Sequence, residues 1–345
     1  MKCPILFIRT WWLLPLALGD AILAQSAPPQ ETSITERLKA EAENLKPLVE
    51  SRLALGYLAA VADLAEVSET RVVLYNKTTR AALTQAEAGT KTHEELEGFQ
   101  QLELDPTFYY TTRYGSPLAY VCALDIAAKA GFETADGARI ADFGFGGVGT
   151  LRLLAGMGAE ALGIDVDPLL MALYSEPGDR GRVPRARAAG SGQNGKVQMV
   201  FGRFPGIADE VGKGFDLFIS KNTLKRGYLH PPPTYERGAL IDLGCDDETW
   251  LGFVRGLLKP GGLFLIYNLA PAQSQDPASF IPWADGRAPF EKELFERMGF
   301  EVLAYDVDQT EKAHAVAKAL GWEKDMDIEN DLFALYTLVR KKGEP

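Results

Sequence analysis

Residues 138 to 165 place a glycine-rich turn between two short apolar runs, and this arrangement limits the chain to few folds. The turn contains Gly144-x-Gly146-x-x-Gly149 and follows the apolar run 138–142. A helix is predicted at 150–158 and a second strand at 161–165. Glycines permit a tight strand-to-helix turn and a close approach of the backbone to a ligand. The segment therefore predicts a βαβ unit with a ligand-binding turn.

The same alternation continues to the end of the chain. Strands are predicted at 138–142, 161–165, 197–201, 215–219, 263–267, 300–304 and 332–339, and helices at 150–158, 168–174, 248–258, 290–298 and 310–320. Strands that alternate with helices form a mostly parallel sheet covered on both faces. We expect an α/β, doubly wound domain of the seven-stranded type over residues 105–345.

The first residues have the parts of a secretory signal peptide. Lys2 and Arg9 precede the apolar run 11–18, and small residues follow at 21–27. This run is shorter than the roughly 20 apolar residues that a membrane-spanning helix needs. We expect residues 1–24 to be a leader that exports the protein to the periplasm or the medium. An uncleaved anchor, the only membrane contact expected, and a misassigned start of a cytoplasmic protein stay open.

Residues 25–104 read as a helical extension. Leucines recur among charged residues from Thr35 to Val67, and Pro47 is expected to break this helix. Residues 71–75 are β-like, and a polar helix is expected from there to Gly98. The extension is expected to cover part of the core or to support a homo-oligomer.

Composition and charge exclude several classes of protein. With 46% hydrophobic and 24% charged residues the chain is globular, and its net charge of −11 argues against a nucleic-acid partner. The histidines 93, 230 and 314 have no partners at metal-ligand spacing, so we expect no metal site. Cys122 is expected to be a buried free thiol, although a Cys122–Cys245 disulfide stays open.

Three features near the glycine turn limit the class of ligand that it can bind. Asp142 lies two residues before the first glycine, where a carboxylate would repel a pyrophosphate but bind an ammonium group. Asp165 ends the next strand, where an acid accepts hydrogen bonds from ribose hydroxyls. Finally, Lys259-Pro-Gly-Gly262 forms a turn before a buried strand.

With these motifs the chain resembles the class I S-adenosylmethionine-dependent methyltransferases. The resemblance covers roughly residues 110–339 and implies that Asp142, Gly144, Gly146 and Asp165 bind S-adenosylmethionine. The cofactor-binding candidates also include residues near these motifs: Gly149, Tyr114, Ser220 and Phe204. Arg203 stands where the family often has an acid for the adenine amine, so Phe204 or the backbone would replace that contact.

The loop after the fourth predicted strand supplies the catalytic candidates. Ligands in open parallel sheets lie beyond the carboxyl ends of the strands. His230 is the candidate general base, with a surface histidine as its alternative. Lys221 is the candidate anchor of an anionic substrate, with a solvated basic turn as its alternative, and Tyr228 is a further pocket candidate. The expected substrate is a small molecule with an O, N or S acceptor.

Two other functions compete with this hypothesis. An NAD(P)-dependent oxidoreductase would also use a glycine turn, but Asp142 and the Lys-Pro-Gly-Gly turn argue against it. An exported, non-catalytic binding protein on a methyltransferase-like fold would explain Arg203 and the leader, because S-adenosylmethionine is made in the cytosol.

Overall fold

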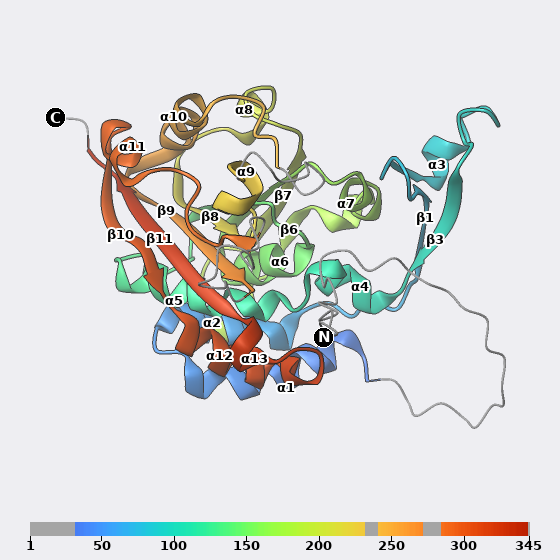
Figure 1. Ribbon diagram of the computed structural model, residues 1–345. Helices are drawn as coiled ribbons and strands as arrows, with labels where there is room; N and C mark the ends of the chain where they lie inside the picture. Colours follow the sequence, from blue (N-terminus) through green and yellow to red (C-terminus); the bar gives the residue numbers. More distant parts are fainter. Residues whose placement is uncertain (1–31, 232–240, 272–283, 344–345) are drawn as a thin grey trace, which may run out of the picture. The chain divides into compact units, whose positions relative to one another are not determined.

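The computed structural model describes residues 32–231, 241–271 and 284–343 (Figure 1). The expected leader, 1–24, lies outside the described residues. Residues Ser33–Pro345 form one compact unit, so the expected extension and the expected catalytic domain are not separate bodies from Ser33 onward. No helix within the described ranges has the length and apolar character that crossing a membrane requires.

An eight-stranded sheet forms the centre of this unit. Its order is β10-β11-β9-β8-β4-β5-β7-β6. The strands are β4 (Arg139–Phe143), β5 (Glu160–Asp165), β6 (Gly181–Val183), β7 (Gly195–Phe201), β8 (Phe215–Lys221), β9 (Leu258–Ala270), β10 (Phe300–Asp308) and β11 (Phe333–Lys341). The seven predicted strands are all present, and β6 is an unpredicted short strand at the edge.

Strand directions confirm the predicted fold class. Strands β7, β5, β4, β8 and β9 pair in parallel, whereas β11 runs antiparallel to β9 and β10, and β6 antiparallel to β7. The chain proceeds from β4 toward β7 on one side and then crosses back to β8 on the other. The order therefore reverses between β4 and β8, and their carboxyl ends border the crevice where such sheets bind ligands.

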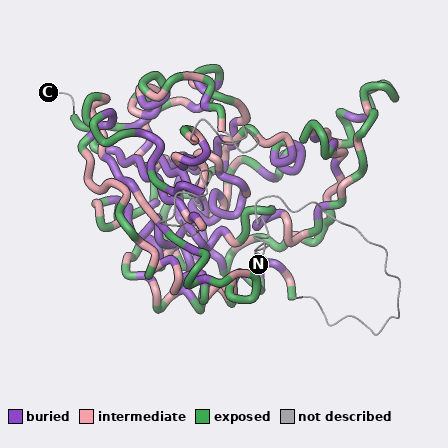
Figure 2. The backbone as a smooth tube through the Cα atoms, in the orientation of Figure 1, coloured by how far each residue is buried: buried purple, intermediate pink, exposed green. Residues whose placement is uncertain are grey.

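Helices cover both faces of the sheet, and the strands between them are largely buried (Figure 2). One face packs against helices that bury aliphatic residues, including α5 (Val121–Lys129), α6 (Val148–Gly156), α7 (Pro168–Leu173) and α12 (Thr310–Ala319). The other face packs against α8 (Ala208–Val211), α10 (Asp247–Leu257) and α11 (Lys292–Arg297). Short helices α4 (Pro106–Thr111), α9 (Arg226–Leu229) and α13 (Ile328–Asp331) complete the fold.

The helical extension is part of the core. Helices α1 (Ile34–Leu45) and α2 (Arg52–Ala60) are separated by a 3-10 turn that contains Pro47, so the predicted break is confirmed. The hydroxyl of Tyr57 on α2 donates to the carbonyl of Pro117 at 2.9 Å and lies 3.3 Å from the Thr150 hydroxyl. Because Tyr57 is fully buried, α2 is fixed against the helix that follows the glycine turn.

A small antiparallel sheet replaces the polar helix predicted after residue 75. Its strands are β1 (Arg71–Asn76), β2 (Ala82–Thr84) and β3 (Phe99–Leu104), in the order β2-β1-β3, and only α3 (Gln85–Ala88) is helical there. Arg71 joins the sheet to the main core through a bidentate pair with the buried Asp179, at 2.7 and 2.8 Å.

Candidate functional site

The glycine turn links β4 to α6 at the carboxyl edge of the sheet. Gly144 and Gly146 have φ values of +71° and +60°, in the left-handed region that glycine adopts without strain. The N–H of Gly144 donates to the carbonyl of Ile164 on β5 at 2.7 Å, which holds the turn against the neighbouring strand. Gly149 serves packing, because a Cβ there would lie 2.7 Å from the carbonyl oxygen of Tyr110.

Side chains from two other segments line the turn. A Cβ on Gly146 would lie 2.7 Å from the Tyr114 ring, and one on Gly144 would lie 2.0 Å from the Thr223 hydroxyl. Arg113, next to Tyr114, pairs with Asp167 beyond β5. Tyr114 is itself 44% exposed. The predicted Tyr114 thus lies against the turn, on the side open to solvent.

Asp142, at the end of β4, is a buried carboxylate without a hydrogen bond. It is 1% exposed, and no hydrogen bond of normal geometry reaches either oxygen among the described residues, although the Tyr120 hydroxyl lies close enough to stabilise the charge. Burial raises the pKa of Asp142 to about 7, while the Tyr120 hydroxyl and the Lys221 ammonium oppose this rise. A buried polar group without a partner costs free energy, so this side chain is suited to a cationic or hydrogen-bonding ligand.

Asp165 ends β5 and is held by the backbone around it. Oδ2 accepts from the N–H of Gly146 at 3.2 Å, and Oδ1 accepts from Val166 and Asp167 at 2.7 and 3.0 Å. Burial raises the pKa of Asp165, and these hydrogen bonds oppose the rise. The hydrogen bonds fix the carboxylate beside the glycine turn. Oδ1 already accepts two of them, whereas Oδ2 accepts one and keeps acceptor capacity for a hydroxyl.

Lys221 ends β8 and points to the same face of the sheet as Asp142. Asp142 is in register with Ile219, and Lys221 lies two residues further along β8, so the two side chains share a face. Lys221 is 9% exposed, and its Nζ lies 5.3 Å from the centre of the Tyr120 ring. Burial lowers the pKa of Lys221 to about 8. Tyr120 was missed at the sequence level, because it lies in a short aromatic segment typical of core packing.

The other predicted residues here, Ser220 within β8 and Tyr228 in α9, contact neighbouring parts of the same segment. Ser220 is buried and its Oγ accepts from the N–H of Leu224 at 3.3 Å. The ring of Tyr228 lies 5.1 Å from the ammonium of Lys225, which donates to the carbonyl of Leu269 at 2.5 Å. Burial lowers the pKa of Lys225 to about 7. A second buried amine therefore follows Lys221 by four residues.

His230 follows α9 and pairs with the first turn of α10. Its Nε2 is 3.0 Å from Oδ2 of Asp247, and its side chain is 44% exposed. This exposure favours the surface alternative given for His230 above. Its role as a general base stays a prediction.

Two residues bear on the expected adenine contact: the aromatic Phe204, which lies in the core, and the apolar Val166, which is exposed to solvent. Phe204 is 2% exposed and stacks with Phe253 at 5.8 Å, so the aromatic cluster accounts for its position. Arg203 pairs with Asp242 at the surface. Val166, directly after Asp165, is 54% exposed. Sequence reasoning missed Val166, although an apolar residue next to the ribose acid was a usable signal.

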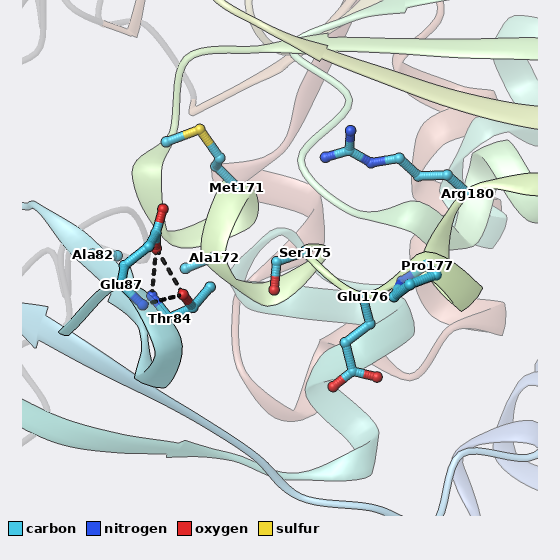
Figure 3. Close-up of a pocket in the computed structure, with 9 residues that line it drawn as sticks. All are labelled: Ala82, Thr84, Glu87, Met171, Ala172, Ser175, Glu176, Pro177 and Arg180. Carbon is cyan, nitrogen blue, oxygen red and sulfur yellow. Dashed lines mark hydrogen bonds between the residues drawn. The ribbon is translucent and has the colours of Figure 1, made fainter. Parts of the chain in front are cut away.

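Two hollows lie elsewhere in the fold. One, of about 370 Å³, lies between the β2–α3 segment and the end of α7, where Thr84 and Glu87 hydrogen-bond to each other (Figure 3). The other, of about 570 Å³, lies among α5, α12 and strands β10 and β11. The lining of neither includes Asp142, Asp165 or Lys221. Within the described ranges there is no cluster of metal-ligating side chains, and Cys122 and Cys245 are free thiols.

Comparisons with known proteins yield structural matches alone. No protein-family model and no curated protein matches the chain. An S-adenosylmethionine-dependent methyltransferase from Mesorhizobium loti is 19% identical, with 65% of this chain and 98% of that chain covered and a TM-score of 0.37. Phosphoethanolamine N-methyltransferase 2 from Haemonchus contortus is 13% identical, with 87% and 76% covered and a TM-score of 0.37. Identities this low concern the fold alone.

Proposed function

We propose that this chain is an S-adenosylmethionine-dependent methyltransferase that acts on a small molecule. The observation that carries the proposal is the Asp142 carboxylate, buried without a hydrogen bond beside the glycine turn. An ammonium group of a ligand would give this carboxylate a charged hydrogen-bonding partner. When bound, S-adenosylmethionine would supply such an ammonium group and a sulfonium methyl group for transfer.

The other residues of the turn suit the rest of that cofactor. Asp165 is held at the end of β5, and its Oδ2 keeps acceptor capacity for a ribose hydroxyl. The exposed Val166 beside it offers apolar surface to an adenine ring. In this arrangement the protein accelerates transfer chiefly by positioning the two reactants and excluding water.

A binding protein without catalysis is the second candidate. Tyr114 and Thr223 lie against the glycine turn, and Arg203 occupies the place of the expected adenine acid. An NAD(P) site is disfavoured, because the pyrophosphate would approach the turn beside Asp142 and meet its negative charge.

Isothermal titration calorimetry distinguishes these functions. We expect saturable binding of S-adenosylmethionine and S-adenosylhomocysteine and no binding of NADH or NADPH. Asp142→Asn, which keeps the shape and removes the charge, should weaken S-adenosylhomocysteine binding at least tenfold. Folded protein that binds neither nucleoside would refute the proposal. Binding without methyl transfer to any small-molecule acceptor would favour the binding protein.

We also propose export, on the leader sequence alone. Cell fractionation of a C-terminally tagged chain tests it. Tagged protein in the periplasm or medium, shortened by about 24 residues, is the expected result. Cytoplasmic protein would contradict export, and a cytoplasmic product that begins downstream of residue 1 would agree with a misassigned start.

A further inference from the structure

We propose that Lys221 binds an anionic oxygen of the methyl acceptor, so that the acceptor is a carboxylate or an acidic hydroxyl compound and not an amine. This inference rests on the proposed function and deepens it. Four observations support it: the place of Lys221 in the sheet, its burial, its lack of a hydrogen-bonded partner, and the charge around it.

The sheet places Lys221 on the strand next to the one that leads into the glycine turn. The turn leaves β4, and Lys221 ends the adjacent strand β8, on the other side of the point where the strand order reverses. Lys221 is in register with Tyr267 on β9, one row nearer the carboxyl edge than Asp142. If the cofactor binds at the glycine turn after β4, the end of the adjacent strand β8 is available to contact the methyl acceptor.

Lys221 is more than nine-tenths buried, yet it has no hydrogen bond or ion pair within the described residues. Its recorded contact is with the face of the Tyr120 ring, at 5.3 Å. The groups that act on its charge are Asp142 and Cys122. A buried ammonium without an acceptor among the described residues costs free energy, and an anion that accepts from it would offset this cost.

The local charge selects against a cationic acceptor. Lys225 is also buried, and the positive charge of Lys221 adds to burial in lowering the pKa of Lys225. An ammonium acceptor would meet the buried charge of Lys221 in a poorly hydrated environment, where like charges repel strongly. The negative charge of Asp142 is already assigned to the ammonium of the cofactor, so it does not offset this repulsion.

A carboxylate acceptor also agrees with the surroundings of His230. The acceptor oxygen forms the O–CH₃ bond with its lone pair, while the C–S bond breaks and its electron pair stays on sulfur. The products are a neutral methyl ester and a neutral thioether, and no proton has to leave. The reaction therefore requires no general base, and His230 can pair with Asp247 at the surface.

Binding measurements on the complex with S-adenosylhomocysteine test this assignment. The probes are straight-chain carboxylates from acetate to octanoate, and the controls are primary amines of the same lengths. We expect carboxylates of a favoured length to bind and the amines not to bind. Lys221→Met should weaken carboxylate binding at least tenfold. Lys213→Met, which removes an exposed lysine before β8, should leave it unchanged.

The two proposals fail in different ways. If S-adenosylhomocysteine does not bind to folded protein, the proposed function is wrong and the acceptor assignment falls with it. If it binds but the amines bind and the carboxylates do not, or if neither series binds, the acceptor assignment alone is overturned. If Lys221→Met weakens S-adenosylhomocysteine but not 5′-methylthioadenosine, Lys221 holds the carboxylate of the cofactor, which also overturns the assignment.

Discussion

Asp125 on α5 holds the start of α2 through Ser51. The Asp125 carboxylate accepts from the backbone N–H of Ser51 at 3.0 Å and from its hydroxyl at 2.6 Å, and the N–H of Glu50 adds a third hydrogen bond at 3.2 Å. Asp125 is 4% exposed. The N-terminal helices are therefore joined to the sheet by a buried polar contact as well as by apolar packing.

We expect Asp125→Ala to lower the free energy of unfolding by about 2–4 kcal/mol, because it leaves buried N–H groups without an acceptor. Asp125→Asn keeps one acceptor oxygen and should cost less. Urea denaturation measures both changes. Asp136→Ala, which breaks a partly exposed pair with Arg185, is the control and should cost less than about 1 kcal/mol. An Asp125→Ala cost as small as that of the control would contradict the role assigned to this contact.

In the absence of ligand, Asp142→Asn should raise the free energy of unfolding, and this gain should grow as the pH rises. The pKa of Asp142 is about 7 in the folded protein and near 3.8 when unfolded, so the folded state binds the extra proton between these values. The carboxylate therefore lowers stability as the pH rises from about 4 to 7, by up to about 4 kcal/mol. The stability difference between the variant and the wild type should widen across this range and level off above it. Denaturation at several pH values measures it, and a constant difference would show that burial does not shift the Asp142 pKa.

Asp165→Ala is expected to weaken S-adenosylhomocysteine binding by about 1–3 kcal/mol, because the ribose diol loses its acceptor. Asp165→Asn, which keeps one oxygen for the N–H groups of Val166 and Asp167, should have an intermediate affinity. Calorimetry gives the affinities, and circular dichroism checks that both variants are folded. Wild-type affinity in folded Asp165→Ala would remove the ribose role.

Gly146→Ala tests the contact between the turn and Tyr114. The variant should lose about 1–2 kcal/mol from its left-handed backbone and more from the clash of the new Cβ with the Tyr114 ring. Gly137 is the matched control, since its φ is +69° and a Cβ there meets no atom within 4 Å. The excess cost at Gly146 over Gly137 in chemical denaturation should shrink in a Tyr114→Ala background, which removes the two ring atoms nearest the new Cβ and keeps only the Tyr114 Cβ at 3.4 Å. If the excess is undiminished there, Tyr114 does not form the wall of the turn.

Lys225→Met removes the second buried amine and tests whether its pKa is lowered in the folded protein. The pKa of Lys225 is about 7 in the folded protein and near 10.5 when unfolded, so the unfolded state binds more protons between these values. The contribution of Lys225 to stability therefore rises with pH from about 7 to 10.5, by up to about 4 kcal/mol, and the variant lacks this rise. The advantage of the variant should be largest near pH 7 and shrink toward pH 10.5. Thermal denaturation across this range tests it, and an advantage that does not change with pH would refute a depressed pKa for Lys225.

The sequence alone predicts the main sheet well and the small sheet poorly. Continuous apolar runs such as 215–219 and 263–267 are typical of strands buried on both faces, and all seven were confirmed. Strand β3 (Phe99–Leu104) alternates less clearly and carries glutamine and glutamate, because it is largely exposed. Its residues pair with β1 residues that lie 23 to 33 positions earlier in the chain, which a local pattern does not reveal.

For the site, the sequence by itself determined the glycine turn, Asp142 and Asp165, because spacing along one βαβ unit fixes where a turn and two strand ends fall. Tertiary structure decided what surrounds them. Tyr120, Asp142 and Lys221 come together through the packing of a distant segment and the register of β4 with β8. Likewise, packing placed Phe204 in the aromatic core, and the fold brought the exposed His230 beside Asp247. Residue type and spacing do not specify these contacts, since they depend on which faces of separate elements meet.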